Sequence, residues 1–441
     1  MESKKQTPIL RAVFLTTFLD LVGVSIIFPL FPQLLDHYLT LEGPDSLIGQ
    51  LVRFLESFSN QSDNSEFLTV VLFGGVLGSL YSVLQFICAP IWGLVSDRYG
   101  RRSTLLITIS GTFLSYLAWF FAKNFAILIL ARLIGGIMAG NISTASAVIA
   151  DTTKRKERSK GMAVIGIAFG IGFVIGPAFG GAASFVDLTQ VWPDSAQWGV
   201  NPFSFAALIA LCLAALNLLY VWFKLPETHP PEKRGKGTLH RTANPLALFR
   251  KTHLPGVQRT NILSFCFLTA FSAMEFTLVF LTVERFQFTP RNNAGMFVFI
   301  GLVIALVQGG AVRRLAPKLG DKPLVIGGLL AIFPGFILIG MSQSLVVLFL
   351  GLALMAAGSA FANPCLSGLI SQYSPQEHQG FSLGLFRSVG ALSRAIGPII
   401  GGLLYWKYGA QSPYSLGAVL IWIPIILAFG LPQPPESSPE V

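Results

Sequence analysis

Charged residues are scarce in this sequence. Asp, Glu, Lys and Arg make up only 12% of its 441 residues, about half the share that soluble domains carry. Hydrophobic residues make up 53%, and apolar runs of about 20 residues recur along the chain, each long enough to cross a bilayer core. This composition excludes a soluble globular protein and predicts an all-α integral membrane protein.

Cysteine and histidine are also rare, and their positions exclude further chemistry. The four cysteines all lie inside apolar runs, and the five histidines lie in loops or at the ends of the runs. No spacing typical of a disulfide framework or a metal site is present, and the runs hold no nucleophile–base pair. We therefore expect no cofactor and no metal, and we disfavour the alternative of a membrane-embedded enzyme or receptor.

Charged breaks, most of them short, separate the apolar runs, so successive runs are expected to be antiparallel neighbours. Together the runs predict twelve transmembrane helices. The predicted spans are 10–35, 67–95, 103–122, 125–150, 160–186, 202–224, 260–283, 293–312, 323–341, 345–370, 380–405 and 414–431.

The 31 Lys and Arg residues are distributed unevenly between the two sides of these spans. The loops of one side carry only Arg53, Lys123, Arg285, Arg291 and Lys407, while most of the others lie on the N-terminal tail and the alternate loops. Because cytoplasmic loops are enriched in Lys and Arg, both termini are predicted to be cytoplasmic. We expect the protein to lie in a bacterial inner membrane, in a eukaryotic organelle membrane or in a eukaryotic plasma membrane. The positive charge forms no single patch, which argues against a nucleic-acid partner.

The sequence repeats itself. The segment GPAFGG at 176–181 returns as GPIIGG at 397–402, and RYGRRSTLL at 98–106 has a weaker counterpart, KLGDKPLVI, at 318–326. The nearly equal offsets predict two pseudo-symmetric halves of six helices each, joined by a cytoplasmic linker. Two parallel halves around a central cavity are typical of secondary transporters. The predicted parts are the first half 1–224, the linker 225–259 and the second half 260–441.

A compact charged motif, GLVSDRYGRR, separates the second and third spans. Asp97 stands at a helix end, where it can pair with a neighbouring Arg or with the positive N-terminus of a helix in the other half. A contact that forms in one state and breaks in the other needs only a few kcal/mol of bias to act as a switch. We predict a gate, with simple loop anchoring as the alternative for its arginines; one glycine would permit close helix approach and the other a tight turn. The predicted gating residues are Gly93, Asp97, Arg98, Gly100, Arg101 and Arg102.

Glycines at a spacing of about four residues follow one face of the fifth span, and a shorter set recurs in the eleventh. Such a face permits backbone-to-backbone packing. Ordinary helix packing is the alternative, and we favour packing at the interface between the two halves. The predicted interface residues are Gly172, Gly176, Pro177, Gly180, Gly181, Gly397, Pro398 and Gly401.

Taken together, these motifs resemble those of the major facilitator superfamily. GLVSDRYGRR is similar to the signature loop between its second and third helices, and RLIGGIMAG from Arg132 is similar to its fourth-helix motif. GFVIGPAFGG is similar to the fifth-helix motif of its proton-driven drug antiporters. With FLDLVGVSIIFPLFP and VIADTT, the resemblance covers nearly the whole chain and points to the tetracycline-resistance exporters and tetracycline-transporter-like proteins. It implies a twelve-helix fold that exports a solute in exchange for protons by alternating access.

Five charged residues fall at membrane depth, where each costs about 2.5–3.5 kcal/mol or more unless it is paired or hydrated. At a rise of about 1.5 Å per residue, Asp20 and Arg132 lie about 15 and 19 Å from the inner surface. Glu275 and Arg394 lie about 22 and 21 Å deep and Arg387 about 10 Å. Similar depth therefore predicts two pairs, Asp20 with Arg132 and Glu275 with Arg394.

We predict that Asp20, Glu275 and Arg132 couple transport to protons and that Arg394 and Arg387 bind the substrate. If a substrate displaces an arginine from a buried acid, the acid is more easily protonated, because burial disfavours its charged form. Substrate binding and proton uptake are thereby coupled. The alternative is a set of static ion pairs. Further predicted substrate-binding residues are Gln85, Asn141, Gln308 and Asn363.

The chain departs from the tetracycline exporters at two positions. The resemblance implies an acid in the third span and a histidine in the eighth, where this chain has Ser115 and Ile304. The two substrate-site arginines have no counterpart in the first half, where Gly166 and Phe173 occupy the matching positions. This favours as substrate an organic anion or an amphipathic molecule that bears a carboxylate or phosphate. We therefore predict a monomeric transporter whose partners are protons, lipid and a small organic solute, working by proton-coupled antiport; a proton symporter or facilitator of an organic anion is the alternative.

Overall fold

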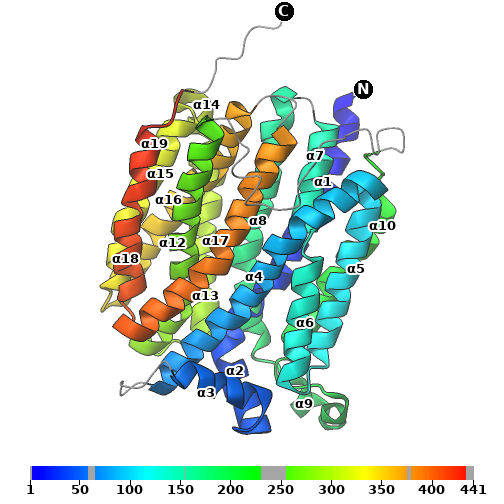
Figure 1. The fold of residues 1–441 in the computed structure, drawn as a ribbon, viewed down its shortest axis with the longest axis vertical. Coiled ribbons are helices and arrows are strands. Elements are labelled where there is room, and N and C mark those ends of the chain that lie inside the picture. Colours follow the sequence, from blue (N-terminus) through cyan, green and yellow to red (C-terminus); the bar gives the residue numbers. More distant parts are fainter. Residues whose placement is uncertain (1, 58–64, 154, 230–254, 375–378, 434–441) are drawn as a thin grey trace, which may run out of the picture.

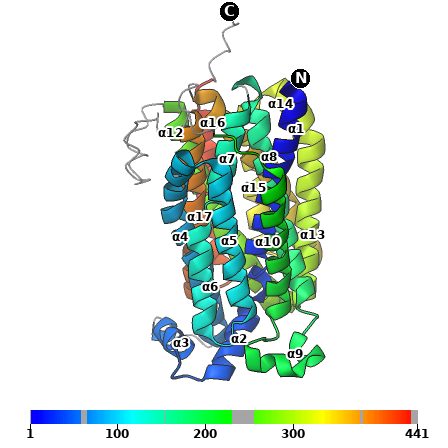
Figure 2. The ribbon, with the colours of Figure 1, turned by 90° about the vertical axis from the view of Figure 1, so that its right-hand side faces the viewer.

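The computed structural model describes residues 2–57, 65–153, 155–229, 255–374 and 379–433. These residues form a bundle of helices that run mostly along its long axis in both views (Figures 1 and 2). The start of the first helix, α1 (Glu2–Ser25), and the end of the last, α19 (Trp422–Phe429), lie at the same end of the bundle (Figure 1). We call this end the terminal end and the other the opposite end.

The first six spans comprise the helices up to α10. Two of these spans are interrupted: the first by the short helix η1, and the fourth between α6 and α7. The bounds are α1 Glu2–Ser25, η1 Phe28–Leu30, α2 Phe31–Glu42, α3 Leu47–Ser57, α4 Ser65–Tyr99, α5 Arg101–Phe120, α6 Phe125–Met138, α7 Asn141–Thr152, α8 Arg155–Ala183, α9 Leu188–Val191, η2 Pro193–Trp198 and α10 Ser204–Lys224.

The last six spans comprise α12 to α19. The eighth span contains a π-helical turn, η4, and the twelfth is divided between α18 and α19. The bounds are α12 Pro255–Phe286, α13 Pro290–Leu306, η4 Val307–Val312, α14 Arg313–Leu319, α15 Asp321–Gly340, α16 Leu345–Tyr373, α17 Gln379–Tyr408, α18 Ser412–Leu420 and α19 Trp422–Phe429.

The prediction of twelve transmembrane helices is confirmed. Within the described chain, 12 helical segments are long and apolar enough to span a bilayer. The first, Pro8–Glu42, is longer than predicted because α2 continues the helical path beyond η1. The eighth, Arg291–Leu319, is longer because α14 continues the helical path beyond η4. Large apolar side chains on several spans are more than half exposed, as expected for a surface that faces lipid: Leu130, Leu216, Leu350 and Val419.

The local structure repeats as the sequence does. Helices α5 and α15 are both 20 residues long, and each follows a glycine with positive φ, 100° at Gly100 and 80° at Gly320. The next helices, α6 and α16, both begin after a side-chain cap, Asn124 or Ser344, whose oxygen accepts from a backbone N–H three residues on. Because glycine adopts positive φ without strain, the same tight turn can open the third and ninth spans.

Packing within each set of six spans is extensive. Helix α1 packs against α8, α7 and α10, and α12 packs against α17 and α19. The pairs that join the two sets most extensively are α4 with α17 and α8 with α13. The division into 1–224, 225–259 and 260–441 stays a prediction: most of the linker lies outside the described residues, and α12 already begins at Pro255.

Helices α4 and α17 meet near the opposite end and diverge toward the terminal end (Figure 1). A Cβ atom added to Gly75 would lie 3.3 Å from the carbonyl oxygen of Pro398, and one on Gly74 would lie 3.2 Å from the Phe280 ring. At the terminal end of α4, a Cβ on Gly93 would meet no described atom within 4 Å. The expectation that Gly93 permits a close helix approach is therefore not met in this state, and close packing along α4 is found at the opposite end.

Candidate substrate cavity and gate

Two adjoining cavities lie between the first and the last six spans. Their empty volumes are about 950 and 1580 Å³, and both are lined by Phe169, Glu275 and Arg394. Asp20 and Arg132 line the smaller cavity, whereas Arg387 lines the larger. The structure thus brings all five membrane-depth charges to one connected region, where depth alone predicted two separate pairs.

Asp20 is held by an amide from the fourth span. The Asn141 Nδ2 atom donates to Asp20 Oδ1 at 2.7 Å, and the Thr108 hydroxyl donates to Asn141 Oδ1. Asn141 is 1% exposed and is not among the residues that line either cavity. Its position suits the orientation of the Asp20 carboxylate rather than direct contact with a solute.

Arg132 is surrounded by aromatic rings. Its Cζ atom lies 6.0 Å from the centroid of the Tyr81 ring and 5.8 Å from that of Trp119, and its buried Nε atom has no hydrogen-bond partner. Within the described residues no ion pair of 4.0 Å or less joins Arg132 to Asp20, so the predicted contact between them is not formed. The faces of aromatic rings attract cations, and here they take the place of a carboxylate.

The second predicted pair is not formed either. Glu275 and Arg394 line the same cavities, yet among the described ion pairs none joins them. Instead the Arg394 Cζ atom lies 4.9 Å from the centroid of the Phe169 ring, on α8. Arg387, which lies on the same face of α17 as Arg394, likewise makes no hydrogen bond or ion pair with a described residue. Matching depth was insufficient because it does not fix the direction in which a side chain points.

Three of the four predicted polar lining residues do line the cavities: Gln85, Gln308 and Asn363. Sequence reasoning did not single out the aromatic residues that accompany them, Tyr81 and Phe169 among others. In a chain with 37 phenylalanines, nothing in the spacing of any one ring distinguishes a cavity wall from a lipid-facing surface.

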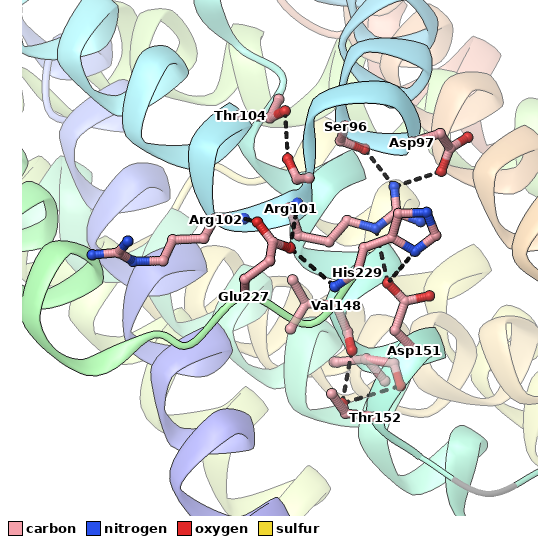
Figure 3. A network of polar contacts seen from close by, with 12 residues as sticks. Ser96, Asp97, Arg101, Arg102, Thr104, Val148, Asp151, Thr152, Glu227 and His229 are labelled. Carbon is pink, nitrogen blue, oxygen red and sulfur yellow. Dashed lines mark hydrogen bonds and ion pairs between the residues drawn. The ribbon is translucent and has the colours of Figure 1, made fainter. Parts of the chain in front are cut away.

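The charged motif, which spans the end of α4 and the start of α5, forms a polar network at the terminal end (Figure 3). Arg101 pairs with Asp97 at 2.5 Å and with Asp151 at 2.9 Å, and its Nη1 atom donates to Ser96 Oγ at 2.6 Å. The Arg101 side chain is only 7% exposed. The pairing of Asp97 with Arg101 is one of the contacts expected from the sequence, whereas Asp151, at the end of α7, was not predicted as a partner.

Glu227, just beyond α10, caps the start of α5 from a distance in sequence. Its two carboxylate oxygens accept from the backbone N–H groups of Arg101 and Arg102, at 2.8 and 3.3 Å. A carboxylate at a helix N-terminus satisfies unpaired donors and complements the helix dipole. His229 joins the network, with Nδ1 3.8 Å from Asp151 Oδ2 (Figure 3). Both residues fall in the segment that the sequence assigned only to the linker.

The remaining residues of the motif have local partners. The Arg102 Nη2 atom donates to the carbonyl oxygen of Trp222 at 2.6 Å, and the Arg98 Cζ atom lies 5.4 Å from the ring of the adjacent Tyr99. Gly100 has φ of 100° and forms the tight turn expected of it.

The glycine faces pack within each set of spans rather than between the sets. A Cβ on Gly172, Gly176 or Gly180 would clash with α1 or the residue that follows it, at 2.8 Å or less from Leu21, Ser25 or Ile26. On α17, a Cβ on Gly397 or Gly401 would lie 2.8 Å from Ser272 or Ala273 of α12. Pro177 and Gly181 are buried in α8.

The prediction that these glycines form the interface between the halves is therefore wrong for this state, with one exception. The exception is Pro398, whose carbonyl oxygen would lie 3.3 Å from a Cβ on Gly75 in the other half. The ordinary packing alternative explains the others, because a glycine face shows that a helix approaches closely without showing which one.

Comparison with known proteins bears on these features. The family model described as Major Facilitator Superfamily matches residues 13–323 and 311–441. The human protein called major facilitator superfamily domain-containing protein 10 is 36% identical over 449 residues, covering 97% of this chain and 94% of its own. The Escherichia coli tetracycline resistance protein, class B, is 28% identical over 401 residues, covering 90% and 88%.

Solved structures give the same result. The crystal structure of the human organic anion transporter MFSD10 (TETRAN) has a TM-score of 0.81 and 36% identity, and covers 96% of this chain and 99% of its own. The xylose transporter XylE of E. coli, at 14% identity and a TM-score of 0.66 over 98% of this chain and 99% of its own, shares the fold.

Proposed function

Because the chain belongs to the Major Facilitator Superfamily, and is thus a membrane transporter rather than an enzyme, we propose that it carries a small organic anion in exchange for protons. The observation that carries this proposal is the charge of the cavity region. Arg132, Arg387 and Arg394 line it against two acids, Asp20 and Glu275. A buried arginine without a carboxylate partner is costly, and an anionic solute offsets that cost.

The composition of the walls supports an amphipathic solute. The polar donors Gln308 and Asn363 lie on the side of Arg387, while the smaller cavity adds Phe28, Phe276 and Phe280. Apolar walls with a few placed polar groups are typical of small-molecule sites. The name of the similar human structure, an organic anion transporter, agrees with this substrate class.

Proton coupling is assigned to the two cavity acids. Asp20 and Glu275 share the cavity region with the arginines, so an anion that neutralises an arginine also changes the field at both acids. The similarity to tetracycline resistance proteins favours export. Symport or facilitated passage of the anion remains the second candidate, since the same acids can release protons in either direction.

We propose further that both termini are cytoplasmic and that the structure is inward-facing. The basic loops favour that orientation, and the close contact of Gly75 with Pro398 lies at the opposite end. The Arg101 network at the terminal end is the proposed gate. It would rearrange when α4 approaches the second half at that end.

A proteoliposome assay tests the proposal. Vesicles containing the protein are loaded with fluorescein, an aromatic anion, and a proton gradient is imposed in either direction; ethidium, an aromatic cation, is the control solute. Antiport predicts that fluorescein moves against the proton flow and that ethidium does not move. Movement of fluorescein with the protons would support symport, and transport of ethidium alone would refute the anion assignment.

A further inference from the structure

One contact in the cavity joins the two halves through a charged group. Phe169 lies on α8, and Arg394 lies on α17. The Arg394 Cζ atom is 4.9 Å from the centroid of the Phe169 ring, within the range at which a guanidinium and an aromatic face attract each other. Both residues line both cavities.

The Phe169 ring offers Arg394 an aromatic face and no hydrogen-bond acceptor, so the N–H groups of the guanidinium are available to an anion. Arginine stacks on aromatic rings through its flat face, whereas it binds a carboxylate through N–H groups that lie in its plane. Arg394 makes no hydrogen bond or ion pair with a described residue. A ring can therefore hold the guanidinium while an anion binds its edge.

We propose that Phe169 is a positioning residue for the anion: it fixes the guanidinium plane of Arg394 from the opposite half of the protein. This inference rests on the proposed function, and it adds that the affinity for the anion depends on the conformational state of the transporter. When α8 and α17 move relative to each other, Arg394 loses its platform, and the anion site loosens. Affinity is then highest in the present state and lower in the state that exposes the cavity at the opposite end.

The surroundings of Phe169 fit such a dependence on state. The residue next to it, Gly170, faces Ile304 and Gln308 across the halves, where a Cβ would have only loose contacts of 3.8 and 3.9 Å. By contrast, Gly172 lies tightly against α1. At Gly172 helix α8 thus packs closely against its own half, whereas at Gly170 it leaves room beside Ile304 and Gln308. The Phe169 ring can therefore follow the first half when the halves move.

The test replaces Phe169 with phenylalanines carrying one, two or three ring fluorines, which weaken the negative face of the ring and barely change its size. Phe336, a fully buried residue of α15 that lines neither cavity, receives the same replacements as the matched control. Fluorescein binding to the purified full-length protein should weaken stepwise, by about two- to tenfold in total, at position 169 only. Phe169→Trp should retain binding, and Phe169→Leu should match the trifluorinated ring.

Transport from the two faces of the vesicle tests the link to state. In Phe169→Leu, the KM for fluorescein should rise on the face that carries the termini and stay unchanged on the other, with kcat altered less than KM. If fluorescein affinity does not change across the fluorinated variants of Phe169 and the protein still transports fluorescein, the positioning role is overturned and the proposed function stays intact. An equal rise of KM on both faces would overturn the link to state. If the wild-type protein neither binds nor transports fluorescein, the proposed function fails and this inference fails with it.

Discussion

The two halves of this transporter share the same arrangement of helices, but their charged side chains have different partners. In the first half, Arg101 pairs with Asp97 and Asp151, and Asp20 accepts a hydrogen bond from Asn141. In the second half, the cavity arginines have no described carboxylate partner. The position that matches Arg101 is held by Asp321, whose carboxylate accepts from the Gln372 amide at 2.7 Å.

This difference separates what the repeat preserves from what it leaves free. Helices α5 and α15 keep the same length, and each keeps a glycine with positive φ before its first residue. The charge at that first residue is inverted, from arginine to aspartate. Under the proposed function, the first half supplies the gate and one of the two proton sites, Asp20, while the second half supplies two of the three cavity arginines that an anion can neutralise.

The largest effect on transport is expected from a change at Asp20, because a neutral amide at this position cannot take up and release a proton. In Asp20→Asn, transport driven by a proton gradient should be abolished, whereas exchange of fluorescein for fluorescein should continue because it needs no net protonation. Gradient-driven and exchange fluxes in proteoliposomes measure this. Asp45→Asn, at a side chain that is 98% exposed, is the control; gradient-driven transport that survives in Asp20→Asn would move the proton site to Glu275.

The next effect concerns the stability of the first-half network. Arg101→Gln removes the cation between Asp97 and Asp151 and should lower the free energy of unfolding by about 3 kcal/mol. The estimate is at the low end for a buried pair because both carboxylates are partly exposed, at 33% and 22%. Thermal unfolding in detergent measures it. An unchanged midpoint would show that the network contributes little to stability.

The affinity of the second-half site should respond to the shape of its cation. Arg394→Lys keeps the positive charge but loses the planar fork that binds a carboxylate through two hydrogen bonds. Fluorescein binding should weaken about tenfold, or about 1.4 kcal/mol. Fluorescence anisotropy with the purified protein checks this, with Lys407→Arg, outside both cavities, as a control. Equal affinities in the wild type and in Arg394→Lys would indicate that Arg394 acts only as a charge.

The smallest expected effect lies at the position that matches Arg101. In Asp321→Asn the side chain can still bond to Gln372, so the free energy of unfolding should change by less than about 1 kcal/mol. Comparing its unfolding midpoint with that of Arg101→Gln sharpens the contrast between the halves. If both variants lose the same stability, the two motifs contribute equally and the contrast fails.

Most of the fold could be predicted from the sequence because bilayer thickness fixes the length of apolar runs. The charged residues of the cavity could also be identified, since a charge at membrane depth such as Glu275 needs a polar environment. Their partners could not. Depth places Arg132 level with Asp20, but only the packing of α5 and α6 decides that Trp119 lies against its guanidinium.

Contacts between distant segments were missed for the same reason. Glu227 resembles any other charge of a linker until the fold brings it to the N-terminus of α5, 126 residues earlier in the sequence. The face of Gly172 and Gly176 predicts close packing correctly, but the sequence does not say that the partner is α1.

Recognition of an anion by the unpaired arginines of the second half is the central proposal for this transporter. The most direct measurement is the binding of fluorescein to purified wild-type protein and to the double variant Arg387→Gln/Arg394→Gln, followed by calorimetry. We expect clear binding to the wild type and a loss of affinity of at least about a hundredfold in the variant. The unfolding midpoint of the variant should be unchanged or higher, because two unpaired buried charges are removed. Binding of equal strength by a correctly folded double variant would contradict this proposal.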